Sequence, residues 1–251
     1  MDSSLSLSVC IPAYSMDGMG AKYLRVSLDI LAKQNFPNFE VVVADQSDDR
    51  NIADLCSSYA DMTVRHLDTR HLKRQGSANT NAAINAAQNE IVKILFQDDF
   101  LNGDDALTKI AHAFGDPEVK WIVTGSEHTR DGHTLIRPFV PKFHDRIQFG
   151  KNTISSPSVL ALHRENAPRF DEDLIWLMDV DYYKQCSLRF GLPKVLCEPL
   201  VVNRQHSGQV SESVRRARVR QELRHVRQKY ATHMSWGDWM HYVGRLRRSF
   251  L

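Results

Sequence analysis

The sequence lacks several features that would place the protein in a specialised class. Its four cysteines, Cys10, Cys56, Cys186 and Cys197, lie far apart and form no CxxC pair, which argues against a zinc site or a disulfide framework. We therefore expect free thiols in a reducing, cytoplasmic compartment. No segment approaches the ~18 consecutive apolar residues of a membrane span. The first residues carry no basic stretch of the kind that opens a secretory signal, so none is expected.

Glycine-rich phosphate loops are also missing. Neither a GxGxxG pattern nor a P-loop occurs, which disfavours dinucleotide-dependent enzymes and P-loop nucleotidases. The stretch IPAYSMDGMG is a poor match to the glycine-rich loop of a nucleotidyltransferase. What is present is an ordinary globular composition, 42% hydrophobic and 25% charged.

Charge is distributed unevenly along the chain. Residues 214–251 contain ten Lys or Arg and only two acids, a net charge of +8, whereas the preceding 213 residues carry −6. This asymmetry predicts a main domain over residues 1–213 and a basic helical extension over residues 214–251. Val219, Leu223, Val226 and Tyr230 recur at helical spacing within the extension. A second apolar set at helical spacing comprises Trp236, Trp239, Met240, Val243 and Leu246.

Three interpretations of the basic extension are open. Its helices could pack on the acidic domain with their arginines in solvent. They could instead contact the inner face of a membrane peripherally, because basic amphipathic helices that contain Trp suit anionic interfaces. Binding to nucleic acid is the third interpretation, and the interleaving of Trp and Arg disfavours it.

Strand-like apolar runs alternate with helical patterns over the first half of the chain. This order predicts an α/β fold with a mostly parallel central sheet covered by helices on both faces. The strand-like runs are Leu5–Pro12, Phe39–Asp45, Met62–His66, Ile91–Phe96 and Val119–Thr124, and the helical ones are Lys22–Asn35, Asn51–Ala60, Gly76–Ala87 and Asp104–Phe114. Further on, residues 130–152 are irregular, residues 158–163 and 200–204 are strand-like, and residues 170–191 begin in a turn and become a helix.

Polar residues follow the ends of three of these strands. Tyr14, Asp45 and the pair Asp98–Asp99 should therefore line one crevice, because ligands of such sheets bind beyond the carboxyl ends of the strands. Adjacent carboxylates repel each other unless a cation lies between them or they cap a helix. Asp104 and Asp105 fit the capping role at the first turn of the next helix, whereas Asp98–Asp99 directly ends a strand.

Five segments, in order, resemble the family 2 glycosyltransferases, which have the GT-A fold. These are SVCIPAY, VVVADQSDD, the stretch from GSANTNAAINAA to ILFQDD, FDEDLIWLMDVDYYKQCSLRFG and NRQHSGQVS, between Ser6 and Ser211. The sequence departs from the usual family pattern at four positions, which weakens any inference about nucleotide preference. Those positions are Ala44, Thr80, Gln97 and Met178.

The resemblance implies a role for each matching residue. Asp99 would bind a divalent cation, Mn²⁺ or Mg²⁺, directly, and Asp98 would contact the ribose or the metal's water shell. Asp179 would be the general base of an inverting transfer. The nucleotide would lie against Pro12, Ala13, Tyr14, Asp45, Asn81 and Asp98.

Four further residues are candidates for contacts with the metal, the diphosphate or a sugar. His206 would complete the metal sphere or touch the diphosphate, and Arg204 would neutralise phosphate. Trp176 would serve as a platform for a sugar ring or pack in the core. Asp181 would contact the acceptor or cap a helix, because it lies two positions from Asp179 and points elsewhere on a helix.

The predicted activity is transfer of a sugar from a UDP- or dTDP-sugar to a hydroxyl of a glycan or lipid-linked acceptor. The alternative is a non-catalytic nucleotide-sugar-binding or scaffold protein with a degenerate GT-A fold. No nucleic-acid partner is expected.

Overall fold

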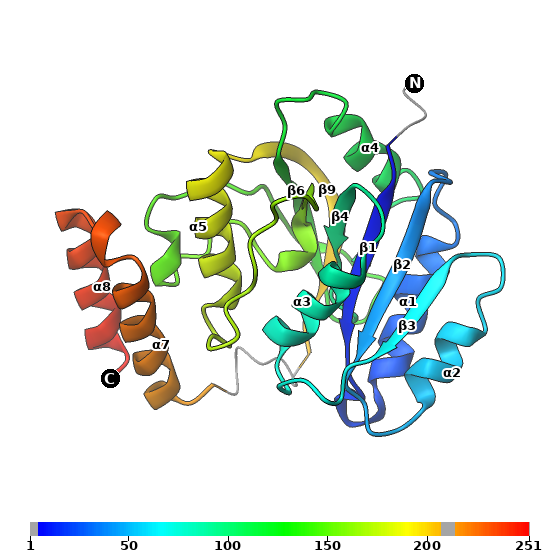
Figure 1. Cartoon of the computed structure of the whole chain (residues 1–251), viewed down its shortest axis with the longest axis horizontal. Coiled ribbons are helices and arrows are strands. Elements are labelled where there is room, and N and C mark those ends of the chain that lie inside the picture. The colour runs from blue at the N-terminus through cyan, green and yellow to red at the C-terminus, as the bar shows by residue number, and fades with distance from the viewer. Residues whose placement is uncertain (1–4, 207–213, 251) are drawn as a thin grey trace.

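The computed structural model of the chain describes residues 5–206 and 214–250. Within them one mixed sheet has the strand order β3-β2-β1-β4-β8-β6-β9-β5, and β7 pairs with β6. Helix α3 lies in front of this sheet in Figure 1 and α1 lies behind it. The strands are β1 (Leu7–Ala13), β2 (Phe39–Asp45), β3 (Val64–Asp68), β4 (Ile91–Ile94), β5 (Phe100–Leu101), β6 (Trp121–Thr129), β7 (Ile136–Phe139), β8 (Leu160–His163) and β9 (Lys194–Arg204).

The first half of the sheet forms as the sequence predicts. Strands β1, β2, β3 and β4 are parallel, and every residue of β1 is buried. Uninterrupted burial is typical of parallel strands that are covered on both faces. The α/β prediction is confirmed. The helices before the extension are α1 (Gly20–Leu31), α2 (Asn51–Ser57), α3 (Gly76–Ala86), α4 (Ala106–Ala113) and α5 (Met178–Phe190), with short 3₁₀ turns at Met16–Gly18, Ile147–Phe149 and Pro157–Val159.

The second half differs from the prediction in two places. Strand β9 begins at Lys194 rather than Leu200, because it pairs along the whole of β6. Its first residues are largely exposed and show no clear alternation, so the sequence pattern does not reveal them. Residues 136–139, which lie in a stretch predicted to be irregular, form β7. Residues 170–191 begin in turns and become α5 at Met178, as the sequence predicts.

The basic extension forms two helices beside α5, namely α7 (Arg216–Lys229) and α8 (Trp236–Arg248), joined by a 3₁₀ turn at Ala231–His233 (Figure 1). Leu223, Val226 and Tyr230 of the first apolar set are buried against the main domain. The second set behaves differently, because Trp236 is 75% exposed and Met240 is 60% exposed. None of the helices within residues 5–206 and 214–250 is both long and apolar enough to span a membrane.

Candidate active site

The carboxyl ends of β1, β2 and β4 meet at one edge of the sheet. Residues Ala13 and Asp45 are direct partners in the β1–β2 register, and β4 leads into Asp98–Asp99 on the other side of β1. The end of β9 joins the same edge, because the backbone N–H of Arg204 donates to Asp99 Oδ1 at 3.0 Å. The predicted strand-end residues therefore lie around one region.

Asp99 is a structural anchor. Its side chain is 4% exposed, and both carboxylate oxygens accept hydrogen bonds. Oδ2 accepts from the Ser156 hydroxyl at 3.1 Å, the Ser158 hydroxyl at 2.5 Å and the Asn203 amide at 2.8 Å, while Oδ1 accepts from the Arg204 backbone. A carboxylate with its acceptor sites occupied in this way offers little to a cation. Direct metal ligation by Asp99, as the sequence predicts, does not fit this environment.

Asp98 is the more accessible member of the pair. Its Oδ2 lies 3.0 Å from His206 Nε2, and the two side chains are 19% and 15% exposed. The His206 ring lies 5.4 Å from the ring of Tyr23, and the Arg204 guanidinium lies 4.8 Å above the same ring. Arg204 Nε also donates to the Asp98 carbonyl at 3.2 Å, which ties the acidic turn to β9.

These residues can supply only some of the ligands of a divalent cation. Within the described residues no cluster of three or more His, Cys, Asp or Glu side chains is arranged to bind a metal ion. The pair Asp98–His206 supplies one carboxylate oxygen and one imidazole nitrogen. That donor set suits a Mg²⁺ or Mn²⁺ ion that takes its other ligands from phosphate oxygens and water, as such ions commonly do.

Asp45 lies beside a small hollow of about 70 Å³ that Ser47, Arg50 and Asp68 also line. Its Oδ1 accepts the Ser47 N–H at 2.8 Å, and its Oδ2 lies 2.9 Å from His66 Nε2. The structure thus makes His66 the partner of Asp45.

Gln97, the departure at the first position of the QDD triplet, holds the exit of β1. Its side chain accepts from the Tyr14 N–H at 2.5 Å and donates to the Tyr14 carbonyl at 2.9 Å. Gly20 must lack a side chain here, because a Cβ would lie 2.1 Å from that carbonyl. Pro12 and Ala13 are buried in β1, whereas Tyr14 is 43% exposed and projects from the turn.

Asn81 does not fit the predicted role in nucleotide binding. Its side chain is 3% exposed. The amide donates to the Phe170 carbonyl and to Glu172 Oε1, both at 2.9 Å, and its oxygen accepts from the Phe170 N–H at 2.9 Å. With its main donors and its acceptor used, Asn81 fastens α3 to the segment that precedes α5.

Asp179 lies in the first turn of α5 and is partly exposed. Its Oδ2 accepts from the Asn152 amide at 2.7 Å, and its Oδ1 accepts from the Val180 N–H at 2.7 Å. Removal from bulk solvent is the largest effect on this carboxyl, and it raises the pKa of Asp179 from 3.8 to about 6. A carboxylate of this kind is suited to proton transfer near neutral pH.

A chain of hydrogen bonds joins Asp179 to the acidic turn. Asn152 also donates to the Ser155 carbonyl at 2.9 Å, the Ser155 hydroxyl donates to Asn203 Oδ1 at 2.9 Å, and Asn203 donates to Asp99. Ser155 has a φ angle of 103°, a conformation that is costly for a residue with a side chain and that clusters at functional sites. Asp179 and the acidic turn are therefore connected through one hydrogen-bond network.

Glu222 of α7 supports the helix that carries Asp179. Its carboxylate is 1% exposed and accepts the backbone N–H groups of Ile175, Trp176 and Leu177 at 2.9–3.0 Å. Arg218 Nε donates to it at 2.7 Å. Sequence reasoning missed Glu222, because in the sequence it is only an acid among arginines.

The other two acceptor candidates are occupied by the extension. Asp181 is fully buried, and its carboxylate accepts from Tyr230, Lys229 and Gln185, each at 2.8 Å. An acceptor contact therefore does not fit Asp181. The Trp176 ring is packed against the core, with the Arg245 guanidinium 5.2 Å from its centroid, so the structure favours the packing alternative for Trp176. Of the predicted NRQHSGQVS segment, residues 207–211 lie outside the described part of the chain.

Comparisons with known proteins agree with this geometry. TarS of S. aureus, residues 1–349 in complex with UDP-GlcNAc, is 19% identical, with a TM-score of 0.72 over 98% of this chain and 72% of that chain. The mannosyltransferase PcManGT from Pyrobaculum calidifontis, in complex with GDP-Man and Mn²⁺, is 19% identical, with a TM-score of 0.61 over 93% and 66%. A search of curated proteins found no match. Residues 8–166, more than half of the chain, match the family described as Glycosyl transferase family 2. The chain therefore belongs to glycosyltransferase family 2 and is a nucleotide-sugar-dependent glycosyltransferase with a GT-A-like fold.

Proposed function

We propose that the protein is an inverting glycosyltransferase that moves a sugar from a UDP- or dTDP-sugar to a hydroxyl of a glycan or lipid-linked acceptor. The observation that carries this proposal is the position of Asp179. It is partly exposed, it has a raised pKa, and hydrogen bonds connect it through Asn152 and Ser155 to the acidic turn. An inverting transfer is a single displacement. It needs a base on the side of the sugar from which the acceptor attacks and a binding site for the leaving diphosphate on the opposite side.

In this proposal Asp179 removes the proton of the acceptor hydroxyl. The hydroxyl is a weak nucleophile until a base within hydrogen-bond distance takes that proton as the new bond forms. Asn152 and the Val180 N–H keep the carboxylate in place. The acceptor oxygen attacks the anomeric carbon opposite the departing diphosphate, so the anomeric configuration inverts.

Asp98 and His206 would hold a divalent cation, Mn²⁺ or Mg²⁺, at the diphosphate. When bound, such an ion stabilises the negative charge that grows on the leaving group. Arg204 orders the acidic turn through the Asp98 carbonyl and adds positive charge nearby. Asp45, with its partner His66, and the exposed Tyr14 would bind the nucleoside at the strand ends.

A melting-temperature screen tests the donor. With Mn²⁺ present, UDP, dTDP or their sugar conjugates should raise the melting temperature of the protein by about 5–10 °C when the ligand concentration is ~100 times its dissociation constant. Ligands that bind the native state stabilise it by mass action. ADP and GDP serve as controls. Equal shifts with every nucleotide would exclude the proposed preference for UDP or dTDP, and the absence of any shift would contradict donor binding.

A second test concerns the support from Glu222. Glu222→Gln should lower turnover and the melting temperature, because a single amide oxygen replaces two carboxylate oxygens that serve three backbone N–H groups, and an unsatisfied buried donor costs about 1–3 kcal/mol. Nucleotide affinity should stay unchanged, since Glu222 contacts the residues just before α5 and not the strand ends where the nucleotide would bind. Glu118→Gln, at an exposed acid, is the matched control. If Glu222→Gln weakened donor affinity and left turnover intact, this role would be wrong.

A further inference from the structure

The exposed face of α8 is apolar and basic at the same time. Trp236, Trp239 and Met240 are exposed at helical spacing on one side of the helix, and the exposed Arg247 lies on the same side. The opposite side carries Asp238 and Tyr242, which are 8% and 5% exposed and face the protein. Helix α8 therefore packs with its polar and aromatic inner side and leaves a tryptophan-rich side in solvent.

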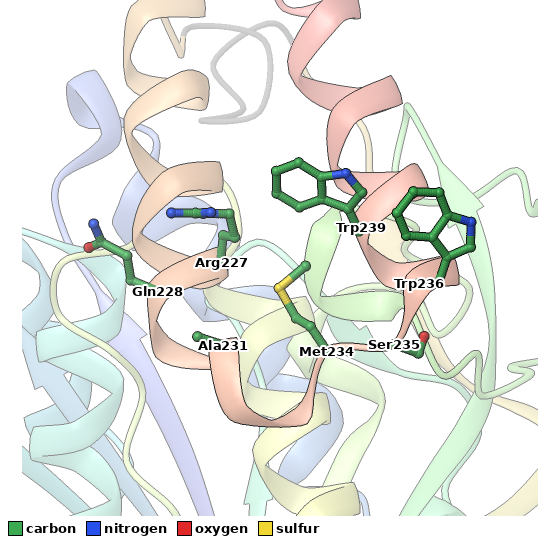
Figure 2. Close-up of a pocket in the computed structure, with 7 residues that line it drawn as sticks. All are labelled: Arg227, Gln228, Ala231, Met234, Ser235, Trp236 and Trp239. Atoms are coloured by element: carbon green, nitrogen blue, oxygen red, sulfur yellow. The ribbon is translucent and has the colours of Figure 1, made fainter.

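A groove of about 510 Å³ adjoins this face between α7 and α8. Figure 2 shows Trp236 and Trp239 projecting from α8, Arg227 and Gln228 coming from α7, and Met234 between the two helices. The Arg227 guanidinium lies 5.9 Å from the Trp239 ring centroid. Cationic and aromatic groups are thus combined in one open surface.

The acids that could neutralise this surface are buried. Glu222 is used by the α5 N-terminus, and Asp238 is used by the capping box with Ser235 at the start of α8. Within the described residues, Arg224, Arg227, Arg247 and Arg248 form no ion pair with a carboxylate. Lys229 pairs with Asp171 and Asp181, and Arg218 pairs with Glu222, so the exposed positive charge of the extension comes from its other arginines.

We propose that the α7–α8 surface, defined by Trp236, Trp239, Met240, Arg227 and Arg247, docks on an anionic lipid bilayer. Tryptophan and methionine side chains would enter the headgroup region while the arginines contact acidic headgroups, which is how basic amphipathic helices bind in the plane of a membrane. A second copy of the chain is disfavoured, because it would bring two arginine-rich faces together. The inference does not depend on the proposed donor or base.

Docking in this way would place the catalytic base beside the bilayer. Arg245 of α8 donates to the carbonyls of Phe149 and Gly150 at 3.1 and 2.9 Å, and it covers Trp176, three residues before Asp179. The helix that binds lipid would thus be packed directly against the segment that leads to the base. An acceptor that is anchored in lipid would meet the site without leaving the membrane.

Vesicle flotation of the full-length protein tests the proposal. At about 0.1 M salt the protein should float with vesicles of equal parts phosphatidylglycerol and phosphatidylcholine and remain behind with phosphatidylcholine alone, since charge attraction acts over about 10 Å under these conditions. Point variants are required, because deletion of residues 214–251 would also remove Glu222. Trp236→Ser combined with Met240→Ser should weaken binding about tenfold or more.

Matched control variants distinguish binding through this surface from nonspecific hydrophobic adsorption and from a general effect of net charge. Leu192→Ser removes an apolar side chain that is 73% exposed beyond α5, and it should leave flotation unchanged. Arg247→Ser with Arg248→Ser should weaken binding about tenfold or more, whereas Arg25→Ser with Lys33→Ser, which removes the same charge near α1, should not.

Three results would overturn the proposal. The first is the absence of flotation with anionic vesicles at that salt concentration. The second is flotation that the Trp236 and Met240 substitutions do not change. The third is a dimer in sedimentation velocity that Trp236→Ser dissociates, because the surface would then be a contact between two copies.

Discussion

Replacing Asp179 with asparagine is expected to lower turnover by about 10³-fold, because a positioned general base typically contributes 10²–10⁴-fold. The substitution keeps the size of the side chain and its bond from the Val180 N–H, so the fold and the affinity for the donor nucleotide should persist. Initial rates at saturating donor, together with nucleotide titrations of the same protein, measure both quantities.

Asp173→Asn is the matched control, because Asp173 is an exposed acid in the turn before α5 whose carboxylate, within the described residues, pairs with Lys73. Its turnover should equal that of the unmodified protein. Normal turnover of Asp179→Asn would mean that the base lies elsewhere. Loss of nucleotide affinity together with turnover would mean that the side chain supports the fold rather than the chemistry.

The pH dependence of the rate follows from the same carboxyl. The charged form is the base, and burial raises the pKa of Asp179 to about 6. The rate should therefore be constant above this pH and fall about tenfold per pH unit below it, as the carboxylate becomes protonated. This acid limb should be absent from the residual activity of Asp179→Asn. An unchanged limb in that variant would assign the titration to another group.

Replacing Asp98 with alanine is expected to abolish the Mn²⁺-dependent part of the nucleotide affinity. Asp98 is partly exposed, and the described contact of its carboxylate is the one with His206, so the melting temperature of the ligand-free protein should change little. Nucleotide titrations with Mn²⁺ and with a chelator measure the metal-dependent difference for each variant.

Asp99→Ala is the informative comparison, because it removes the neighbouring acid. It leaves the hydroxyls of Ser156 and Ser158, the Asn203 amide and the Arg204 N–H without their acceptor. Each unsatisfied buried group costs about 1–3 kcal/mol, so the melting temperature should fall by several degrees. If Asp99→Ala instead melted normally and lost only the metal dependence, Asp99 would be the ligand after all.

The local patterns in the sequence were sufficient to predict most of the fold. Continuous apolar runs predicted β1, β2 and β4, because the strands of a covered parallel sheet are buried along their whole length, and the polar residues at the ends of these runs predicted the crevice beyond them. The extended start of β9 escaped prediction, since its first six residues show no alternation of buried and exposed side chains and their pairing with β6 makes them a strand.

The extension illustrates a limit of periodicity. Two apolar stripes at the same spacing had opposite outcomes, because Leu223 and Val226 are buried and Trp236 and Met240 are exposed. Periodicity shows that a helix has an apolar side, but it does not show what covers that side. The packing of α7 against α5, with Tyr230 and Lys229 on Asp181, decides which stripe is buried.

By itself, the sequence determined the α/β class, the family and the positions along the chain of the strands that end near the acids. It also placed Asp179 near the start of a helix. These features depend on short stretches of neighbouring residues. Only the tertiary structure decided that Asp99 is an anchor and Asp98 its accessible neighbour, and that Glu222 supports the helix of the base. Those roles depend on hydrogen bonds between residues 45 to 105 positions apart, which no local pattern records.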